Sequence, residues 1–295
     1  IMNSELIRND FPILKTKVGG HQIVYFDNAA TTQRPLPVVN AVLDYTTHEN
    51  GNPHRGAHIF AISASEAYDT SKEVVRDFIH ARSEKEIIYT RNTSESLNLV
   101  ARSYGETHLK AGDHILITIA EHHSNLVTWQ RVAKKTGATL DYIYVDKETG
   151  HFPEEELKKI DDPRVKLFAF AEVSNVLGID FDPKPLIARA HAHGAIVVLD
   201  GAQSTPHKPV DVQDLDCDFF AFSGHKMCSM GGIGVLYGKE ELLNDMEPFL
   251  MGGDMIEAVH EQETTYAELP AKFEAGTQYV EGAVSLVAAI RYVQA

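Results

Sequence analysis

A lysine and an aspartate each follow an apolar run that is typical of a buried strand. Asp200 comes directly after residues 195–199, and Lys226 comes shortly after the aromatic run of residues 219–222. A lysine in such a place tends to have a lowered pKa and can form a Schiff base with an aldehyde. An aspartate there can hold the proton of a cationic ring nitrogen. The ordinary alternatives are a solvated surface lysine and a helix-capping aspartate.

Two hydroxyl side chains, Thr93 and Ser94, lie where a strand expected over residues 86–90 turns into a helix. The unpaired N–H groups at a helix N-terminus, together with the positive end of the helix dipole, form a binding site for anions. Thr93 and Ser94 therefore predict a phosphate site. Taken alone, the same segment also fits an ordinary helix cap, with Glu95 or Ser96 in the first turn.

A histidine and an amide follow two further expected strands. His122 comes after the strand that ends near Ile119, and Asn175 comes after the strand that ends at Ala171. A histidine beside a cofactor can stack on its ring and move protons, and the amide can donate to a phenolate oxygen or simply form a turn. The ligand spacing of a zinc site is absent, so the sequence predicts no metal.

These side chains together meet the needs of pyridoxal 5′-phosphate. The cofactor requires a lysine for its aldehyde, an acid for its ring nitrogen and donors for its phosphate. Competing nucleotide motifs fit poorly. Gly232-Ile233-Gly234 lies within a strand-like segment, which excludes a dinucleotide fingerprint, and Gly238-Lys239 is followed by Glu240, so there is no P-loop.

Strand-like and helical patterns alternate along the chain and predict the elements that position these residues. Apolar, near-continuous strands separated by helices indicate an α/β fold with a mostly parallel sheet covered on both faces. Ligands of such sheets bind beyond the carboxyl ends of the strands. The expected helices are 38–47, 64–79, 94–104, 126–135 and 185–193, and the expected strands are 86–90, 114–119, 140–145, 165–171, 195–199, 219–222 and 233–237. Gly105, Gly137 and Gly194 are expected to end three of the helices.

Composition narrows the class of protein. The 295 residues carry 43% hydrophobic and 23% charged side chains, as in ordinary globular proteins, with a formal net charge of −15. Such an acidic chain is repelled by nucleic acid. No signal peptide or membrane-spanning run is apparent. Two cysteines, Cys217 and Cys228, do not make a disulfide framework, so we expect a reducing, cytoplasmic setting. We expect residues 1–20 to form an N-terminal arm and residues 21–295 one cofactor-binding domain.

The motifs resemble those of a known family. The sequence is similar to the class V aminotransferase-type pyridoxal-phosphate enzymes, and more narrowly to the group II, SUF-type cysteine desulfurases, which also act as selenocysteine lyases. The resemblance covers essentially the whole chain and rests on the segments 11–14, 25–32, 54–56, 93–95, 121–123, 174–178, 200–203, 223–226 and 273–277. It implies the fold-type-I transferase architecture, with a seven-stranded sheet flanked by helices, and a homodimer.

The resemblance also implies an activity. L-Cysteine, or selenocysteine, would be converted to L-alanine, with its sulfur taken up as an enzyme persulfide and passed to a sulfur-acceptor protein for iron–sulfur cluster assembly. Another β-lyase or aminotransferase of the same fold, or a non-catalytic scaffold, are the alternatives.

The resemblance assigns roles residue by residue. Lys226 would carry the cofactor and move the substrate proton, Asp200 would pair with the ring nitrogen, and His122 would stack on the ring. The remaining assignments are Asn175 and Gln203 near the phenolate oxygen, Thr93, Ser94, Ser223 and His225 at the phosphate, Gly276 and Thr277 at the phosphate of a neighbouring subunit, and Asn28, Ala29, His54 and Arg55 at the substrate.

The sequence departs from the family pattern at several positions. Family members continue into a smaller C-terminal domain with the persulfide cysteine and a substrate-binding arginine, so we expect this chain to be a fragment that does not complete the reaction. Neither cysteine matches the position of the nucleophile. The loop Ser229-Met230-Gly231 lacks the usual proline, and Glu172, Lys272 and Gln278 replace the usual histidine, arginine and proline.

Overall fold

The computed structural model describes residues 4–295, so residues 1–3 of the expected arm lie outside the described residues. The chain divides into two compact units. One unit contains the described residues up to Val75 together with Ser223–Ile233 and Thr277–Ala295, and the other contains Arg76–Phe222 and Gly234–Gly276.

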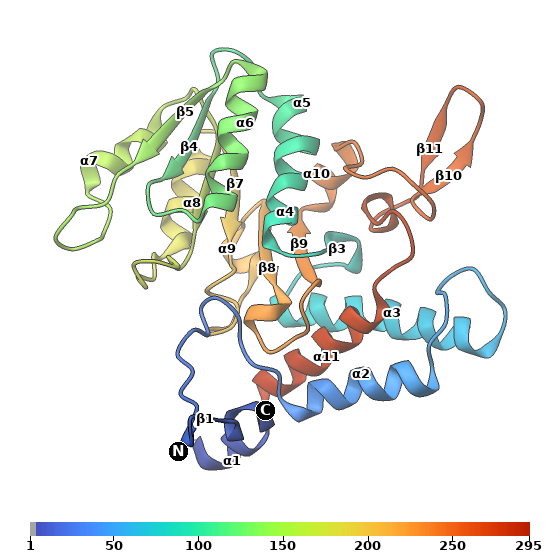
Figure 1. Ribbon diagram of the computed structural model, residues 1–295. Coiled ribbons are helices and arrows are strands. Elements are labelled where there is room, and N and C mark those ends of the chain that lie inside the picture. The colour runs from blue at the N-terminus through green and yellow to red at the C-terminus, as the bar shows by residue number, and fades with distance from the viewer. Residues whose placement is uncertain (1–3) are drawn as a thin grey trace. The chain divides into compact units, whose positions relative to one another are not determined.

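The second unit is built around a seven-stranded sheet with the order β3-β9-β8-β7-β6-β4-β5 (Figure 1). The pairs β5–β4, β4–β6, β6–β7 and β7–β8 are parallel, and β9 is antiparallel to β3. The expected α/β class and mostly parallel sheet are confirmed. The strands are β3 (Ile87–Thr90), β4 (His114–Thr118), β5 (Thr139–Ile143), β6 (Val165–Ala171), β7 (Ile196–Asp200), β8 (Phe219–Ser223) and β9 (Gly234–Gly238).

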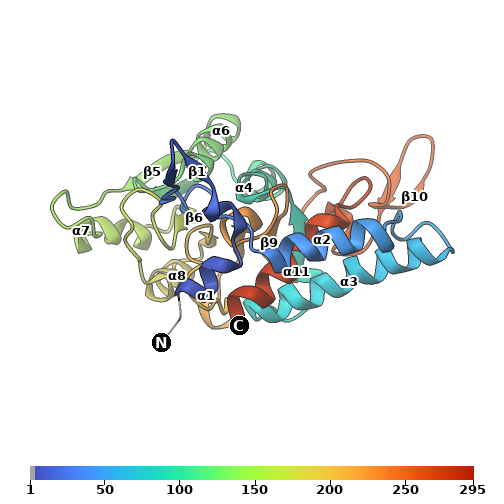
Figure 2. The same cartoon turned by 60° about the horizontal axis from the view of Figure 1, so that its bottom comes forward.

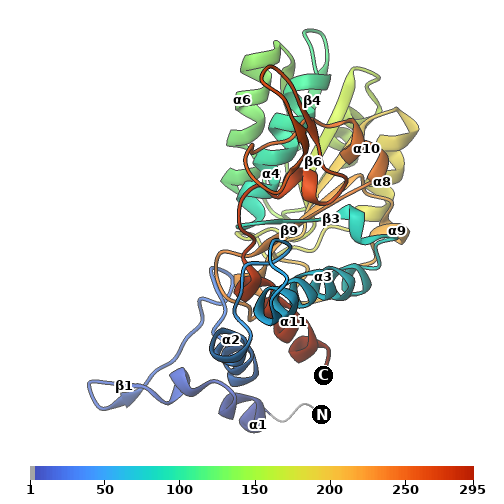
Figure 3. The same ribbon diagram turned by 90° about the vertical axis from the view of Figure 1, so that its right-hand side faces the viewer.

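Apolar side chains cover both faces of this sheet. Leu97 of α4 (Thr93–Val100) and Trp129 of α6 (Val127–Thr136) belong to one buried cluster with Ile115, Ile117 and Phe219 of the strands. The opposite face carries stacked phenylalanines of β6, whose ring centroids are 4.6 Å apart. Figure 3 shows α4 and α6 on one side of the sheet, and α8 (Pro183–Ala192) and α9 (Val212–Leu215) on the other. Because helices cover both faces of the sheet, side chains on both sides of its strands are buried and apolar.

The helix stop expected at Gly105 is wrong. The chain continues from α4 through a π-helical turn, η3 (Ala101–Gly105), into α5 (Glu106–His108). Gly105 is buried, and a β-carbon there would lie 3.2 Å from Val132 of α6. The glycine therefore permits close packing of two helices rather than ending one. The stop at Gly137 is confirmed, because Gly137 caps α6 in the left-handed conformation with φ +78°.

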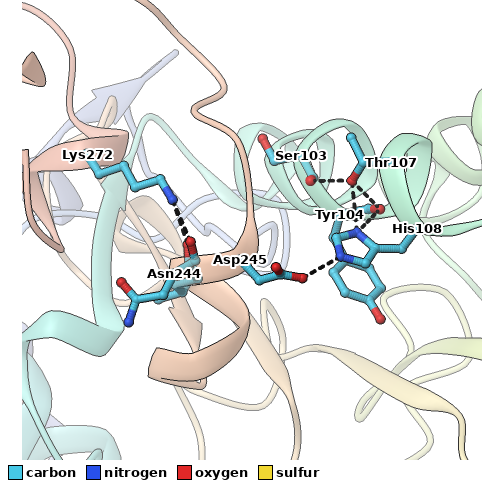
Figure 4. Close-up of polar contacts among 8 residues, drawn as sticks. Ser103, Tyr104, Thr107, His108, Asn244, Asp245 and Lys272 are labelled. Atoms are coloured by element: carbon cyan, nitrogen blue, oxygen red, sulfur yellow. Dashed lines mark hydrogen bonds and ion pairs between the residues drawn. The ribbon is translucent and has the colours of Figure 1, made fainter. Parts of the chain in front are cut away.

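A polar cluster joins α5 to α10 (Glu240–Asp245), as Figure 4 shows. His108 Nε2 lies 2.7 Å from a carboxylate oxygen of Asp245. Lys272 Nζ donates to the carbonyl oxygens of Asn244 at 2.9 Å and Leu243 at 3.3 Å, at the C-terminal end of α10. A cation there stabilises the negative end of the helix dipole. Lys272, the position at which an arginine is usual, is thus a helix-capping residue.

The first unit consists mainly of helices. Helix α11 (Val280–Gln294) packs along α2 (Leu36–His48), and α3 (Ile59–Ile79), whose last turn belongs to the second unit, lies beside them (Figure 2). The unit also contains α1 (Ser4–Asn9), η1 (Pro12–Lys15), the short strands β1 (Lys17–Val18) and β2 (His21–Gln22), and η6 (Gly224–Lys226).

The remaining short elements belong to the second unit and connect its larger ones. They are η2 (Glu84–Glu86), η4 (His123–Asn125), α7 (Glu154–Leu157), η5 (Lys158–Asp161), η7 (Ala271–Phe273) and the hairpin of β10 (Ile256–Val259) with β11 (Thr264–Tyr266). Among the described residues, no helix combines the length and the apolar character that crossing a membrane requires.

Candidate active site

Asp200 is the last residue of β7 and is 5% exposed. It lies between Ala171 of β6 and Ala221 of β8 in the parallel register. One of its carboxylate oxygens accepts the N–H of Ala202 at 2.9 Å. The strand ladder and this turn fix a buried carboxylate at the carboxyl edge of the sheet, where the sequence predicted it.

The residue after Asp200 must be a glycine. A β-carbon on Gly201 would lie 2.1 Å from Cζ of Phe220, whose side chain is fully buried. Gln203 follows in the same turn and is 8% exposed. The backbone of Gly201 donates to the carbonyl oxygen of Ala221 at 2.8 Å, so the turn is anchored to the neighbouring strand.

The segment before α4 forms a complete helix N-terminus. Asn92 is the N-cap, and its side-chain oxygen accepts the N–H of Glu95 at 3.0 Å, while Glu95 accepts the N–H of Arg91 at 2.6 Å. Thr93 and Ser94 occupy the first two helical positions, as expected. The ordinary cap and the predicted anion site are therefore not alternatives, because Asn92 supplies the cap and leaves the two hydroxyl residues in the first turn.

A serine that the sequence analysis did not single out links this helix end to His122. The hydroxyl of Ser124 is hydrogen-bonded to the hydroxyl of Ser94 and lies 3.0 Å from Nδ1 of His122. The Ser124 N–H also donates to Nδ1 at 3.2 Å. Since Nδ1 accepts, the neutral ring carries its proton at Nε2. The structure thus brings the predicted anion site and the predicted stacking histidine together. The sequence signal that could have revealed Ser124 is its position two residues after His122.

Asn175 lies in an exposed turn after β6. The turn is held by Ser174, whose hydroxyl accepts the N–H groups of Val176 at 3.3 Å and Leu177 at 3.1 Å, and Gly178 has φ +65°. Asn175 is therefore presented on a fixed turn, in agreement with its expected place after a strand.

In the first unit, Lys226 ends the single-turn helix η6 and is half-buried. Its segment is held by two threonines near the N-terminus of the chain. The carbonyl oxygen of His225 accepts the N–H of Thr32 at 3.0 Å and the hydroxyl of Thr31 at 3.1 Å, and the hydroxyl of Thr32 accepts the N–H of Cys228 at 2.7 Å. Burial, with the charges of Lys226 and Arg34, lowers the pKa of His225.

The unusual loop after Lys226 is anchored to α11. The hydroxyls of Ser229 and Ser285 are 2.7 Å apart, and the N–H of Met230 donates to Ser285 at 3.3 Å. Two residues of the loop adopt a positive φ, Gly232 with +87° and Cys228 with +71°. The loop without proline is therefore ordered by side-chain hydrogen bonds.

The other candidate residues are exposed, except for Ser223. His54 contacts α3 rather than the lysine segment: its N–H donates to Ser65 at 2.8 Å, and its Nε2 lies 3.0 Å from Asp69. The exposed candidates in the first unit are Asn28, Ala29, His54, Arg55 and Thr277. Gly276 is also exposed and is the last residue of the second unit. Ser223, the last residue of β8, is buried at 3% exposure.

The close approach of β9 to the helix cap yields a testable prediction. A β-carbon on Gly234 would lie 2.6 Å from Cα of Asn92, a backbone atom that cannot move aside cheaply. We expect Gly234→Ala to lower the free energy of unfolding by about 1–3 kcal/mol, as overpacking typically does. Thermal unfolding measures the effect. Gly231→Ala is the matched control, because nothing lies within 4 Å of its added carbon; equal unfolding temperatures for the two variants would contradict this account.

Residues 24–295 match the family model described as aminotransferase class-V. The chain belongs to this aminotransferase class-V family. A protein of Halalkalibacterium halodurans named "Probable cysteine desulfurase" is 49% identical over 293 residues, which cover 99% of this chain and 72% of that protein. A "Cysteine desulfurase" of Synechococcus elongatus is 49% identical over 288 residues, 98% of this chain but only 46% of that protein.

A solved structure agrees with the class-V assignment. The cysteine desulfurase from Thermococcus onnurineus NA1 superposes with a TM-score of 0.92 at 42% identity, covering 100% of this chain and 71% of that one. This chain therefore spans 72%, 46% and 71% of the lengths of these three relatives, respectively.

A buried glutamate of the second unit forms an ion pair through one of its two oxygens. Glu172, which follows β6 and is 4% exposed, lies 2.6 Å from Nζ of Lys208, and Lys208 also pairs with Asp180 at 2.8 Å. The ion pairs with Glu172 and Asp180 raise the pKa of Lys208 although its burial acts in the opposite direction. The charge that replaces the usual histidine is thus neutralised locally.

Proposed function

We propose that this chain forms the cofactor-binding domain of a pyridoxal-phosphate-dependent cysteine desulfurase. The observation that carries the proposal is the buried carboxylate of Asp200 at the carboxyl end of β7, in a chain of the class-V family. Relatives named cysteine desulfurase support the choice of L-cysteine as substrate. Selenocysteine is kept as a second possible substrate because the family resemblance implies it.

The residues fit the cofactor by the chemistry of their donors. A buried carboxylate suits a cationic ring nitrogen, the first turn of α4 with Thr93 and Ser94 suits a phosphate, and the half-buried amine of Lys226 suits an aldehyde. The proposal assigns Ser223 and His225 to the phosphate as well, and Asn175 and Gln203 to the phenolate oxygen. We retain residues 1–20 as an arm and 21–295 as the cofactor-binding domain within this proposal.

Each side chain then has a defined task. The bound cofactor supplies an electron sink for charge that develops at the substrate α-carbon. Asp200 holds the proton on the ring nitrogen, and Lys226 moves a proton at the substrate α-carbon through Nζ. His122, with its proton at Nε2, packs on the ring and offers a proton donor at its face. Asn28, Ala29, His54 and Arg55 are assigned to the substrate side.

The sulfur leaves L-cysteine to a thiol, which gives L-alanine and a persulfide. Cys217 cannot be this thiol, because it is fully buried and burial raises its pKa. Burial also raises the pKa of Cys228, which disfavours the thiolate that attacks sulfur. We therefore propose that neither cysteine of this chain is the accepting thiol.

The wider setting is also part of the proposal. We place the protein in the cytoplasm, in SUF-type iron–sulfur cluster assembly, with a separate protein as the final sulfur acceptor. We assign the exposed Gly276 and Thr277 to the phosphate site of a partner subunit in a homodimer.

The decisive experiment adds pyridoxal phosphate to the purified chain and records its absorption spectrum before and after borohydride reduction. We expect the reduced cofactor on the peptide that contains Lys226. Release of alanine from L-cysteine, with an added thiol as sulfur acceptor, supports desulfuration. A keto-acid product indicates an aminotransferase or β-lyase instead, and absence of any covalent cofactor would favour a non-catalytic scaffold.

A further inference from the structure

Glu121 supplies a hydrogen-bond acceptor to β6 beyond the end of β4. The parallel register of β4 with β6 reaches Ile117 opposite Ala169, and β4 ends at Thr118, whereas β6 continues to Ala171. The N–H of Ala171 donates to Oε1 of Glu121 at 3.1 Å. A side-chain oxygen thus takes the place of a strand carbonyl at the carboxyl edge of the sheet.

Two more hydrogen bonds fix this carboxyl group. The hydroxyl of Thr118 lies 2.5 Å from Oε1, and the amide nitrogen of Asn125 donates to Oε2 at 2.6 Å. Asn125 cannot turn its amide around, because its own oxygen accepts the indole N–H of Trp129 at 2.9 Å and that group is only ever a donor. Asn125 and Trp129 are both fully buried. Oε2 of Glu121 must therefore be an acceptor.

The same carboxyl group is one strand away from Asp200. Ala171 is the register partner of Asp200, and the N–H of Glu172 donates to the carbonyl oxygen of Asp200 at 3.1 Å. Burial, with the negative charge of Asp200, raises the pKa of Glu121 to about 8, although Thr118, Asn125 and Ala171 act in the opposite direction. Among the residues of β4, β6, η4 and β7, which surround Glu121, Asp200 is the only acidic residue. A change at Glu121 therefore alters the electrostatic surroundings of Asp200.

We propose that Glu121 is a positioning residue of the candidate cofactor site, which holds the end of β6 beside Asp200 and the start of the loop that carries His122. This inference rests on the proposed function, because it treats Asp200 and His122 as cofactor-binding residues. In this role Glu121 acts through these neighbours, and we assign it no direct part in binding substrate or cofactor.

A polarity swap tests the inference. In Glu121→Gln the single amide oxygen can accept from Asn125 or from Ala171 but not from both, so one donor loses its acceptor. In Asn125→Asp two carboxyl groups face each other and must share a proton. The double variant Glu121→Gln/Asn125→Asp restores one donor and one acceptor, and its new carboxylate would still accept from Trp129. We expect each single variant to weaken pyridoxal-phosphate binding by about tenfold, the factor that corresponds to one hydrogen bond, and to shift the pH at which the bound cofactor's absorbance titrates. The double variant is expected to restore both.

Glu86→Gln is the control. Glu86 is a 4%-exposed carboxyl group of the same unit, whose pKa is also raised by burial, and it accepts the N–H of Arg82 at 3.0 Å. It is expected to leave both cofactor readouts unchanged. The inference would be overturned if both single variants bound pyridoxal phosphate with the wild-type affinity and the absorbance of the bound cofactor titrated at the wild-type pH.

Hydrogen exchange of the cofactor-free chain separates this inference from the proposed function. We expect faster exchange in the peptide that contains Ala171 in each single variant, with protection regained in the double variant. If the wild-type chain binds no pyridoxal phosphate, the proposed function fails, and the exchange data alone decide whether Glu121 holds β6. Unchanged exchange in the single variants would overturn the positioning role.

Discussion

Replacement of Lys226 by alanine is expected to abolish covalent attachment of pyridoxal phosphate. With an added thiol as the sulfur acceptor, it is also expected to lower alanine release from L-cysteine by about 10³-fold or more. A positioned proton-transfer group contributes about 10²–10⁴-fold, and the variant also loses the amine that holds the cofactor aldehyde. The fold should be unaffected, since Lys226 is half-buried at the end of a single-turn helix. Reduction with borohydride followed by peptide mapping measures attachment, and alanine quantification measures turnover.

A matched control separates the role of this lysine from a general loss of positive charge. Lys134 is exposed on α6, and Lys134→Ala is expected to behave like the wild-type chain. Lys226→Arg keeps the charge but cannot form the Schiff base, so it should also fail to retain the cofactor. If reduced cofactor appears on another lysine, or if Lys226→Ala keeps wild-type turnover, the assignment of Lys226 is wrong.

The parts of the fold that could be predicted from sequence are those with a simple apolar period. Strand β6 was predicted with its observed bounds, Val165–Ala171, because a short apolar run, interrupted only by the exposed Lys166, is typical of a strand buried on both faces. The places of Asp200 and Lys226 followed directly, since each comes shortly after such a run. Helix α11 was missed, because glycine, serine and alanine positions interrupt its apolar pattern and it is buried on several sides.

The contacts that hold the candidate site residues could not be predicted, because they join segments far apart in the chain. Thr32 binds the carbonyl oxygen of His225 across 193 positions of sequence, and no local pattern marks that partnership. The link from Ser94 through Ser124 to His122 depends on where α4 begins relative to η4. A glycine after a helical pattern, such as Gly105, usually indicates the end of a helix. Here the glycine instead allows α6 to pack closely, a contact that the local sequence does not reveal.

Gly201 is the position at which a single added methyl group should have the largest structural effect on the acid site. The β-carbon of Gly201→Ala would lie 2.1 Å from a ring atom of Phe220, and this ring is fully buried in β8. Either the ring or the turn after Asp200 must move. We expect the free energy of unfolding to fall by about 1–3 kcal/mol, and pyridoxal-phosphate binding to weaken by about tenfold or more, since about 1.4 kcal/mol is one factor of ten. Thermal unfolding and a cofactor titration measure the two effects.

A second substitution shows whether the ring contact is the cause. Phe220→Leu alone should destabilise the chain, because it leaves a cavity under β8. In combination with Gly201→Ala it provides the space that the methyl group needs, so the double variant should lose less stability than the sum of the two single losses. Residues in direct contact typically show coupling of about 0.5–3 kcal/mol in such a cycle. Additive losses would mean that the methyl group acts through the backbone of the Asp200 turn instead, and cofactor affinity should then remain low in the double variant even though the ring has been reduced in size.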